Sequence, residues 1–193
     1  MTDKPNISDL IRRSVAAIAA MSPACIESID RVAAMLIEAF SSGKKVLICG
    51  NGGSAADAQH IAGELAGHFQ RERRPLPAMA LSTDTSVLTA IANDYSFEEV
   101  FARQVQAAGE ANDVLWAIST SGNSPNVLAA ARAARGIGMK VVAFTGVGGG
   151  KLAGLADVAL KAPADVTWLI QQCHQVAYHA VCEIIDAAFG GDQ

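Results

Sequence analysis

The chain has 193 residues, of which 51% are hydrophobic and 5% aromatic, and its 15 basic and 19 acidic side chains give a formal net charge of −4. This length suits one domain with a sizeable core, and the mild acidity argues against a nucleic-acid partner, because phosphate backbones are bound by clustered Lys and Arg. No signal-peptide pattern is present, no apolar run reaches the roughly 18 residues of a membrane helix, and the four cysteines form no C-x-x-C pair, so we expect a cytoplasmic protein with free thiols and no membrane partner.

The N-terminal part of the chain is predicted to be helical. Apolar residues recur at helical spacing over residues 7–42, and Ser22-Pro23 marks a break between two helices. Asn6 or Ser8 is expected to cap the first helix, and Gly43 to end the second. We expect residues 1–42 to form a helical arm on an α/β core of residues 43–193, the whole chain being one domain. The high apolar fraction predicts that such an arm packs between subunits, although an alanine-rich core explains it as well.

Short apolar runs then alternate with helical patterns, which indicates parallel strands joined by right-handed crossovers, with helices on both faces of the sheet. Small-residue loops follow three of the strands. Because ligands of open α/β sheets bind at the carboxyl ends of the strands, we expect these loops to build the site. The predicted strands are residues 46–49, 78–81, 114–118, 141–144 and 158–160; the main helices are 54–69, 85–92, 97–108, 124–134 and 168–189; and the loops are 50–54, 119–124 and 145–150.

The first of these loops, Gly50-Asn51-Gly52-Gly53-Ser54, lets the backbone turn sharply and opens a helix that Ser54 can cap. With Ala55 it also fits the dinucleotide fingerprint G-x-G-x-x-A. That fingerprint requires an acidic residue about 20 residues further on, and Asp84 lies too far along the chain. A nucleotide-dependent oxidoreductase is therefore a weaker hypothesis.

The second loop carries four hydroxyl groups, on Ser119, Thr120, Ser121 and Ser124, and leads into a helix predicted to begin at Pro125. Hydroxyls and free helix N-terminal amides can surround the three oxygens of a phosphate without Lys or Arg. An ordinary cap and turn accounts for one hydroxyl but not for four. The loop therefore predicts a phosphate site.

Two helices carry further candidate residues. His60 and Glu64 stand at i and i+4, where they can ligate a metal or simply satisfy each other as a polar pair. The last helix has a polar band, within which Gln171 and His179 lie about 12 Å apart along the axis, so the spacing leaves the choice of ligands open. The band comprises Gln171, Gln172, His174, Gln175 and His179; the basic cluster of Arg71, Arg73 and Arg74 is interpreted as a solvated turn before Pro75.

Several motifs matching in order make the chain similar to the sugar-isomerase (SIS) domain family. They are CGNGGSAADAQHIAGEL, LSTDTSVLTAIANDYSFEEVF, ISTSGNSPNVLAAA and the helix from Gln171 to His179. The resemblance covers nearly the whole chain. It implies a three-layer α-β-α sandwich with a five-stranded parallel sheet and extra N-terminal helices, assembled as a homotetramer with active sites between subunits.

The resemblance also implies roles for individual residues. The sugar would be held by Asn51, Gly52, Gly53, Asn93 and Asp94 with Glu64 and Gln171, and its phosphate by Ser119, Thr120, Ser121 and Ser124. The metal, usually zinc and one ion per subunit, would be bound by His60, Glu64, Gln171 and His179. One position departs from the family pattern, because His68 stands where many relatives carry Arg or Lys. His68 could pair with Glu64, or Arg71 could replace the missing basic group.

The activity that the resemblance implies is an aldose–ketose isomerisation of sedoheptulose 7-phosphate to D-glycero-D-manno-heptose 7-phosphate, for lipopolysaccharide heptose. A carboxylate suits proton abstraction on the way to an enediolate, so Glu64 is assigned as the base and His179 as the acid. Two alternatives stay open: a non-catalytic SIS module that binds the replication initiator DnaA, or an isomerase of another sugar phosphate. Non-catalytic relatives are altered at the His and Glu positions, which this chain retains.

Overall fold

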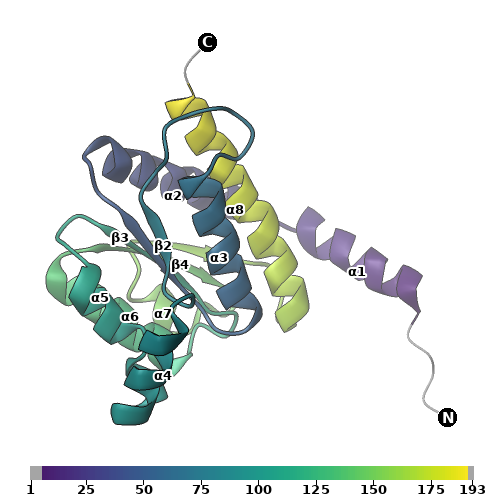
Figure 1. The fold of residues 1–193 in the computed structure, drawn as a ribbon. Coiled ribbons are helices and arrows are strands. Elements are labelled where there is room, and N and C mark those ends of the chain that lie inside the picture. Colours follow the sequence, from purple (N-terminus) through teal and green to yellow (C-terminus); the bar gives the residue numbers. More distant parts are fainter. Residues whose placement is uncertain (1–5, 191–193) are drawn as a thin grey trace.

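A computed structural model describes residues 6–190 and shows a five-stranded sheet at the centre of the molecule (Figure 1). All neighbouring strands are parallel, in the order β2-β1-β3-β4-β5, which confirms the predicted sheet. Each predicted strand is present, with ends shifted by at most one residue. The strands are β1 (Val46–Cys49), β2 (Ala78–Ala80), β3 (Val114–Ile118), β4 (Lys140–Thr145) and β5 (Val158–Lys161).

Helices cover both faces of the sheet, so the fold is the predicted three-layer α-β-α sandwich (Figure 1). Side chains alternate along each strand, and in β3 Trp116 faces one core while Leu115 faces the other. One core lies under α2 (Pro23–Ser41), α3 (Gly53–Ala66) and α8 (Thr167–Phe189). The other lies under α4 (Thr85–Asp94), the 3-10 helix η1 (Phe97–Glu99), α5 (Ala102–Ala108), α6 (Pro125–Ile137) and α7 (Gly150–Ala153).

Helix α1 (Ile7–Ala19) extends away from this body, and only its C-terminal part contacts α8 (Figure 1). The side chain of Asn6 caps it by accepting the backbone N–H of Ser8, as one of the two predicted caps. An apolar stripe along α1 faces solvent. Its members are Ile7, Leu10, Ile11 and Val15, which are 38–71% exposed.

Most predicted helix boundaries are confirmed, and one cap is wrong. Pro23 and Pro125 each occupy the first turn of a helix, and Gly43 follows α2 with φ +71°. Ser54 does not cap α3: Gly52, at φ +55°, is the capping residue, and Ser54 is buried inside the first turn. A glycine at position 52 lets the helix begin two residues earlier than a serine cap would.

The four cysteines are free and buried, as predicted. Over residues 6–190, no helix combines the length and the apolar character that crossing a bilayer requires.

The interpretation of the basic cluster as a solvated turn is wrong for Arg73. Its side chain is 1% exposed and donates from Nε to Asp186 Oδ1 at 2.6 Å. Its Nη atoms donate to the carbonyls of Glu64, Leu65 and Gly67 at the end of α3. These carbonyls have no partner within the helix, so Arg73 caps α3 from a distance while its charge is balanced by α8.

The carboxylate of Asp186 also binds the loop that follows α3. Its Oδ2 accepts the backbone N–H groups of Gln70 and Arg71 at 2.7 and 2.9 Å. Burial raises the pKa of Asp186, but the hydrogen bonds from Arg71, Gln70 and Arg73 outweigh burial and hold the pKa below its ordinary value. The resulting stabilisation is present above the ordinary Asp pKa and is lost as the pH falls through the lowered one.

We expect Asp186→Asn to reduce the free energy of unfolding by about 3–5 kcal/mol at neutral pH, because Arg73 would keep a buried charge without its counter-ion. Urea denaturation measures the change. Glu72→Gln, one residue from Arg73 but exposed, serves as the control and should stay within about 0.5 kcal/mol of the parent. A loss below about 1 kcal/mol for Asp186→Asn would show that the pair does not anchor the loop.

Candidate active site

The candidate site lies at the carboxyl edge of the sheet, between β1 and β3. After β1 the chain builds β2 on one side and then returns to add β3 on the other, so the two following loops separate at this point. Such a switch point leaves a crevice in which ligands bind. A cavity of about 300 Å³ is found there, lined by Asn51, Gly52, Gly53, Ser54, Ser119, Thr120, Ser124, Thr167 and Gln171.

Ser119, Ser121 and Ser124 bring their hydroxyl groups together beside this cavity, which Ser119, Thr120 and Ser124 line and Ser121 does not. Ser119 Oγ lies 2.9 Å from Ser124 Oγ and 3.4 Å from Ser121 Oγ. Ser124 precedes α6, which begins at Pro125, and the N–H groups of Val127 and Leu128 are bonded to Asn126 Oδ1 and Ser124 O, so within the first turn only the N–H of Asn126 is left for a ligand. Ser119 is buried, whereas Ser121 is exposed and accepts the N–H of Asn123. Neutral donors thus surround a space suited to an anion.

The third predicted loop, residues 145–150, does not line the cavity; in that respect the sequence prediction is wrong. Residues 145–150 instead pack against the loop of residues 119–124. The N–H of Gly146 donates to Thr120 O, and a Cβ on Gly122, at φ +64°, would collide with the backbone of Gly149. Only glycine fits this crossing, because the two backbones touch there.

The first loop is tied to the helix of the second by a pair of side-chain amides. Asn51 Nδ2 donates to Asn126 Oδ1 at 2.9 Å, and Asn126 Nδ2 returns the bond to Asn51 Oδ1 at 2.8 Å. Asn126 is 2% exposed. Asn126 Oδ1 also accepts the backbone N–H of Val127, whereas Asn51 keeps one N–H and one lone pair, so Asn51 can still face a sugar hydroxyl while its orientation is set by Asn126.

Helices α3 and α8 run parallel beside the cavity, and paired contacts mark both ends. Near their starts, a Cβ added to Gly53 would collide with the side-chain amide of Gln171. Near their ends, Glu64 lies with His179, and Asp186 with Arg73. Gln171 therefore lies against the glycine loop, about 12 Å along α8 from His179.

His60, Glu64 and His179 come together between these helices. Their ligand atoms all lie within 4.8 Å of one another, and His60 Nε2 is 2.9 Å from Glu64 Oε1. The His60 and Glu64 side chains are 40% and 22% exposed, so the group opens to solvent on one side. Two imidazoles and a carboxylate form a donor set that suits Zn²⁺, with room for further ligands.

Aromatic rings enclose the imidazole of His179. Phe69 stacks on it with a centroid distance of 5.6 Å, and the rings of Tyr178 and His60 meet it edge-on. Burial is the main cause that lowers the pKa of His179, helped by the positive charge of His60 and opposed by Glu64. A lowered pKa keeps the ring neutral, which is the form that binds metals.

A second layer of polar groups lies behind His60. The Tyr178 hydroxyl is 3.0 Å from His60 Nδ1 and 3.5 Å from Asp57 Oδ1. Burial raises the pKa of Asp57 to about 6, against the lowering effects of Tyr178 and His60. Burial and the charge of Asp57 raise the pKa of Tyr178 well above its ordinary value.

Other residues singled out from the sequence lie elsewhere. Asn93 and Asp94 bond to each other at the exposed end of α4, away from this cavity. His68 is exposed beyond the end of α3, and Glu64 pairs with His60 instead. His174 is fully buried with Nε2 on Thr145 O, and burial lowers its pKa to about 4, so it acts as a core residue.

Sequence reasoning missed four residues that the structure places at or behind the site: Asp57, Asn126, Thr167 and Tyr178. Asp57 stands three residues before His60, and Tyr178 immediately precedes His179. A polar residue beside a candidate ligand on an otherwise apolar helix is a usable signal. Asn126 and Thr167 gave no comparable signal, because a polar residue near a helix start is expected as a cap.

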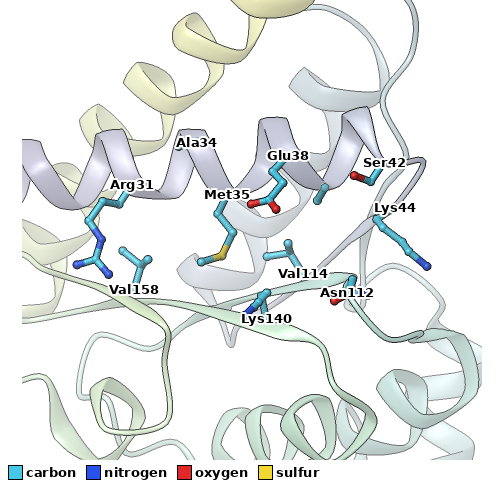
Figure 2. Close-up of a pocket in the computed structure, with 11 residues that line it drawn as sticks. Arg31, Ala34, Met35, Glu38, Ser42, Lys44, Asn112, Val114, Lys140 and Val158 are labelled. Atoms are coloured by element: carbon cyan, nitrogen blue, oxygen red, sulfur yellow. The ribbon is translucent and has the colours of Figure 1, made fainter.

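A larger cavity, of about 630 Å³, lies between α2 and the amino ends of the central strands (Figure 2). Met35 points from α2 toward Val114 and Val158, with Arg31 and Glu38 on either side of it along the helix. It is at the opposite edge of the sheet from the candidate site. None of the predicted site residues lines it.

Comparison with known proteins identifies the class first. The SIS domain family model matches residues 11–146, a range that includes helix α3 and the two loops that line the cavity. The chain therefore belongs to the SIS domain family.

Relatives narrow this to the phosphoheptose isomerases. The chain is 52% identical over 188 residues to the phosphoheptose isomerase of Bradyrhizobium sp. strain BTAi1, covering 96% of this chain and 95% of that one. It is also similar to the solved structure of a phosphoheptose isomerase from Francisella tularensis, with TM-score 0.88, 40% identity and 94% and 96% of the two chains covered. The structure of GmhA from Neisseria gonorrhoeae gives TM-score 0.83 and 45% identity, with 93% and 94% covered.

The contact between Gly53 and Gln171 yields a testable consequence. We expect Gly53→Ala to displace the Gln171 amide and to lower kcat/KM for the sugar phosphate by about tenfold or more, since misplaced groups at a site cost rate steeply. Steady-state kinetics measures the effect. Gly63→Ala is the matched control: it lies in the same helix with nothing within 4 Å of its added Cβ, and it should raise stability by about 0.5–1 kcal/mol without loss of activity. Equal activity in both variants would contradict the tight packing at Gly53.

Proposed function

We propose that this chain interconverts sedoheptulose 7-phosphate and D-glycero-D-manno-heptose 7-phosphate, an aldose–ketose isomerisation that passes through an enediolate. The observation that carries the proposal is the convergence of His60, Glu64 and His179 on the two helices that border the hydroxyl-lined cavity. Relatives named phosphoheptose isomerase, about half identical over nearly the full length, support the substrate assignment.

The phosphate end of the substrate is assigned to residues 119–124. Ser119, Thr120, Ser121 and Ser124 supply hydroxyl donors, and the N-terminus of α6 adds the N–H of Asn126 and the positive end of its dipole. No Lys or Arg is among the described residues that line this cavity. Binding by neutral groups holds the anion in a fixed orientation without adding a strong charge near the reacting carbons.

The proton transfers are assigned to Glu64 and His179. Starting from the ketose, the Glu64 carboxylate removes a proton from C1, and the electron pair moves to the C2 carbonyl oxygen to form the enediolate. His179, neutral at the start, takes the proton from the C1 oxygen and passes it to the C2 oxygen. Glu64 then returns its proton to C2, which leaves an aldehyde at C1. Asn51, Gly52 and Gly53 are assigned to the sugar hydroxyls at the mouth of this space.

The residues present fit one Zn²⁺ per subunit. Nitrogen and oxygen atoms of His60, Glu64 and His179 already face one another, and we assign Gln171 as a further ligand, which requires its amide to turn from Gly53 toward His179. When bound, such an ion polarises the substrate carbonyl and stabilises negative charge on its oxygen. Because ligation lowers the basicity of a carboxylate, the two assignments of Glu64 compete.

We expect Glu64→Gln and His179→Ala to lower kcat for sedoheptulose 7-phosphate by about 10²–10⁴-fold, since each removes a proton-transfer group. A coupled assay for the heptose product measures turnover, and fructose 6-phosphate assayed alongside tests for another sugar phosphate. Glu72→Gln provides an exposed control on the neighbouring loop and should keep full activity.

Near-parental turnover in both Glu64→Gln and His179→Ala would refute the assignment of these residues. A folded, inactive parent that binds an initiator protein such as DnaA would favour the non-catalytic alternative.

We further propose that the enzyme is a homotetramer with active sites between subunits. The solvent-facing stripe of α1 supports this, because monomers rarely leave such an apolar helix face uncovered. Asn93 and Asp94, exposed and remote within one subunit, would then bind the sugar in a neighbour's site. A location in the cytoplasm and a role in lipopolysaccharide heptose formation are proposed from the free cysteines and the family relationship.

The double variant Ile11→Asp/Val15→Asp should dissociate the tetramer, because it places two charges in the apolar stripe of α1. Light scattering after size-exclusion chromatography gives the mass. Arg12→Ala changes the same helix beside the stripe and should leave the mass unchanged. A tetramer of parental stability in the double variant would exclude α1 from the interface.

A further inference from the structure

Three side chains behind the candidate metal group form a chain of hydrogen bonds. Tyr178, on α8, places its hydroxyl 3.0 Å from His60 Nδ1 on α3. On its other side the hydroxyl lies 3.5 Å from Asp57 Oδ1, one helical turn before His60 and at the long end of hydrogen bonding. The chain therefore runs from a carboxylate through a phenol to an imidazole.

The two nitrogens of His60 have different surroundings. Nε2 faces Glu64 Oε1 and the metal group, whereas Nδ1 faces only Tyr178 among the contacts of the described residues. A neutral imidazole carries one proton, so Nε2 has a free lone pair for a metal only when the proton is on Nδ1. That N–H then needs an acceptor, and the Tyr178 oxygen is at the right distance.

A phenol that accepts a hydrogen bond must still place its own proton. Asp57 provides the acceptor: its side chain is partly buried, and its Oδ2 has no hydrogen-bond partner among the described residues. A buried carboxylate with spare acceptor capacity favours a donated hydrogen bond. With Asp57 accepting, the Tyr178 oxygen turns its lone pairs toward His60.

We propose that Asp57 and Tyr178 are positioning residues: when a metal replaces the contact between His60 Nε2 and Glu64 Oε1, they hold His60 in the tautomer with its proton on Nδ1 and its Nε2 free to bind the metal. The inference rests on the proposed metal site and deepens it. Groups that orient metal-bound histidines in this way change metal affinity about 10–100-fold when removed.

The tyrosine ring has a separate packing role that a test must leave intact. Its centroid lies 5.4 Å from that of His60 and 4.7 Å from that of His179, both in edge-on geometry. Phenylalanine keeps these ring contacts and removes only the hydroxyl. Tyr178→Phe thus breaks the chain of hydrogen bonds from Asp57 through Tyr178 to His60, which we call the relay, and leaves the ring packing unchanged.

We expect Tyr178→Phe to weaken Zn²⁺ binding about 10–100-fold, measured on the metal-free protein by competition with a chromophoric chelator. Tyr95→Phe is the matched control, because Tyr95 is the other of the two tyrosines in the chain. Its ring is exposed, stacks with the guanidinium of Arg103 and lies outside the metal group of its own subunit. It should bind Zn²⁺ as the parent does. His60→Ala removes the proposed ligand itself and gives the Zn²⁺ affinity of a site that lacks one ligand.

Asp57→Ala tests the outer step of the relay. It should weaken Zn²⁺ binding about tenfold on its own but by less than twofold in the Tyr178→Phe background, because Asp57 acts only through the hydroxyl. Asp30→Ala, an exposed site on α2, controls for loss of a carboxylate. In protein labelled with ¹⁵N-histidine, the zinc-loaded parent should show His60 protonated at Nδ1, and Tyr178→Phe should lose that single state.

Zn²⁺ binding by His60→Ala and by Tyr178→Phe together distinguishes failure of the relay from failure of the metal site. Loss of Zn²⁺ binding in His60→Ala with parental affinity in Tyr178→Phe would overturn the relay and keep the metal site. Unchanged Zn²⁺ binding in His60→Ala would overturn both. Additive losses in the Asp57 and Tyr178 variants would also overturn the relay, because they would show two independent structural effects.

Discussion

The parallel packing of α3 and α8 on one face of the sheet is the constraint on which the candidate site depends. His60 and Glu64 come from one helix and His179 from the other, so a slide of either helix would separate them. The buried ion pair between Arg73 and Asp186 resists such a slide, because Asp186 is part of α8 and Arg73 binds the last carbonyls of α3. A buried pair of this kind adds little net stability but fixes one arrangement of the elements it joins.

The polar groups near the starts of α3 and α8 differ in kind from those near their ends. Near the helix starts, at the switch point of the sheet, neutral hydroxyl and amide groups line the cavity that we propose as an anion cradle. Near the helix ends, titratable side chains meet and are backed by aromatic rings and by Tyr178. In the proposed reaction, this separation would keep the phosphate charge away from Glu64 and His179, the groups assigned to proton transfer.

Close backbone packing, rather than charge, determines the shape of the anion cradle. Gly122 and Gly149 touch where two loops cross, and Gly53 leaves space for the Gln171 amide. The amide pair of Asn51 and Asn126 then joins the loops after β1 and β3. Each contact involves residues distant in sequence, and for this reason local patterns misplaced loop 145–150 as part of the lining. Ser54 was misplaced as a cap for a local reason, because Gly52 begins the helix earlier.

By itself, the sequence determined the strands, the helices and the parallel direction of the strands, because short apolar runs and helical spacing leave few alternatives in an α/β chain. It also marked His60, Glu64 and the hydroxyl loop as chemical groups. Only the tertiary structure decided which residue of the last helix joins His60 and Glu64, since the packing of α8 on α3, not spacing along α8, selects His179. Likewise, the burial of Arg73 and the link from Asp57 through Tyr178 to His60 arise from contacts across more than a hundred residues of sequence, which local patterns do not encode.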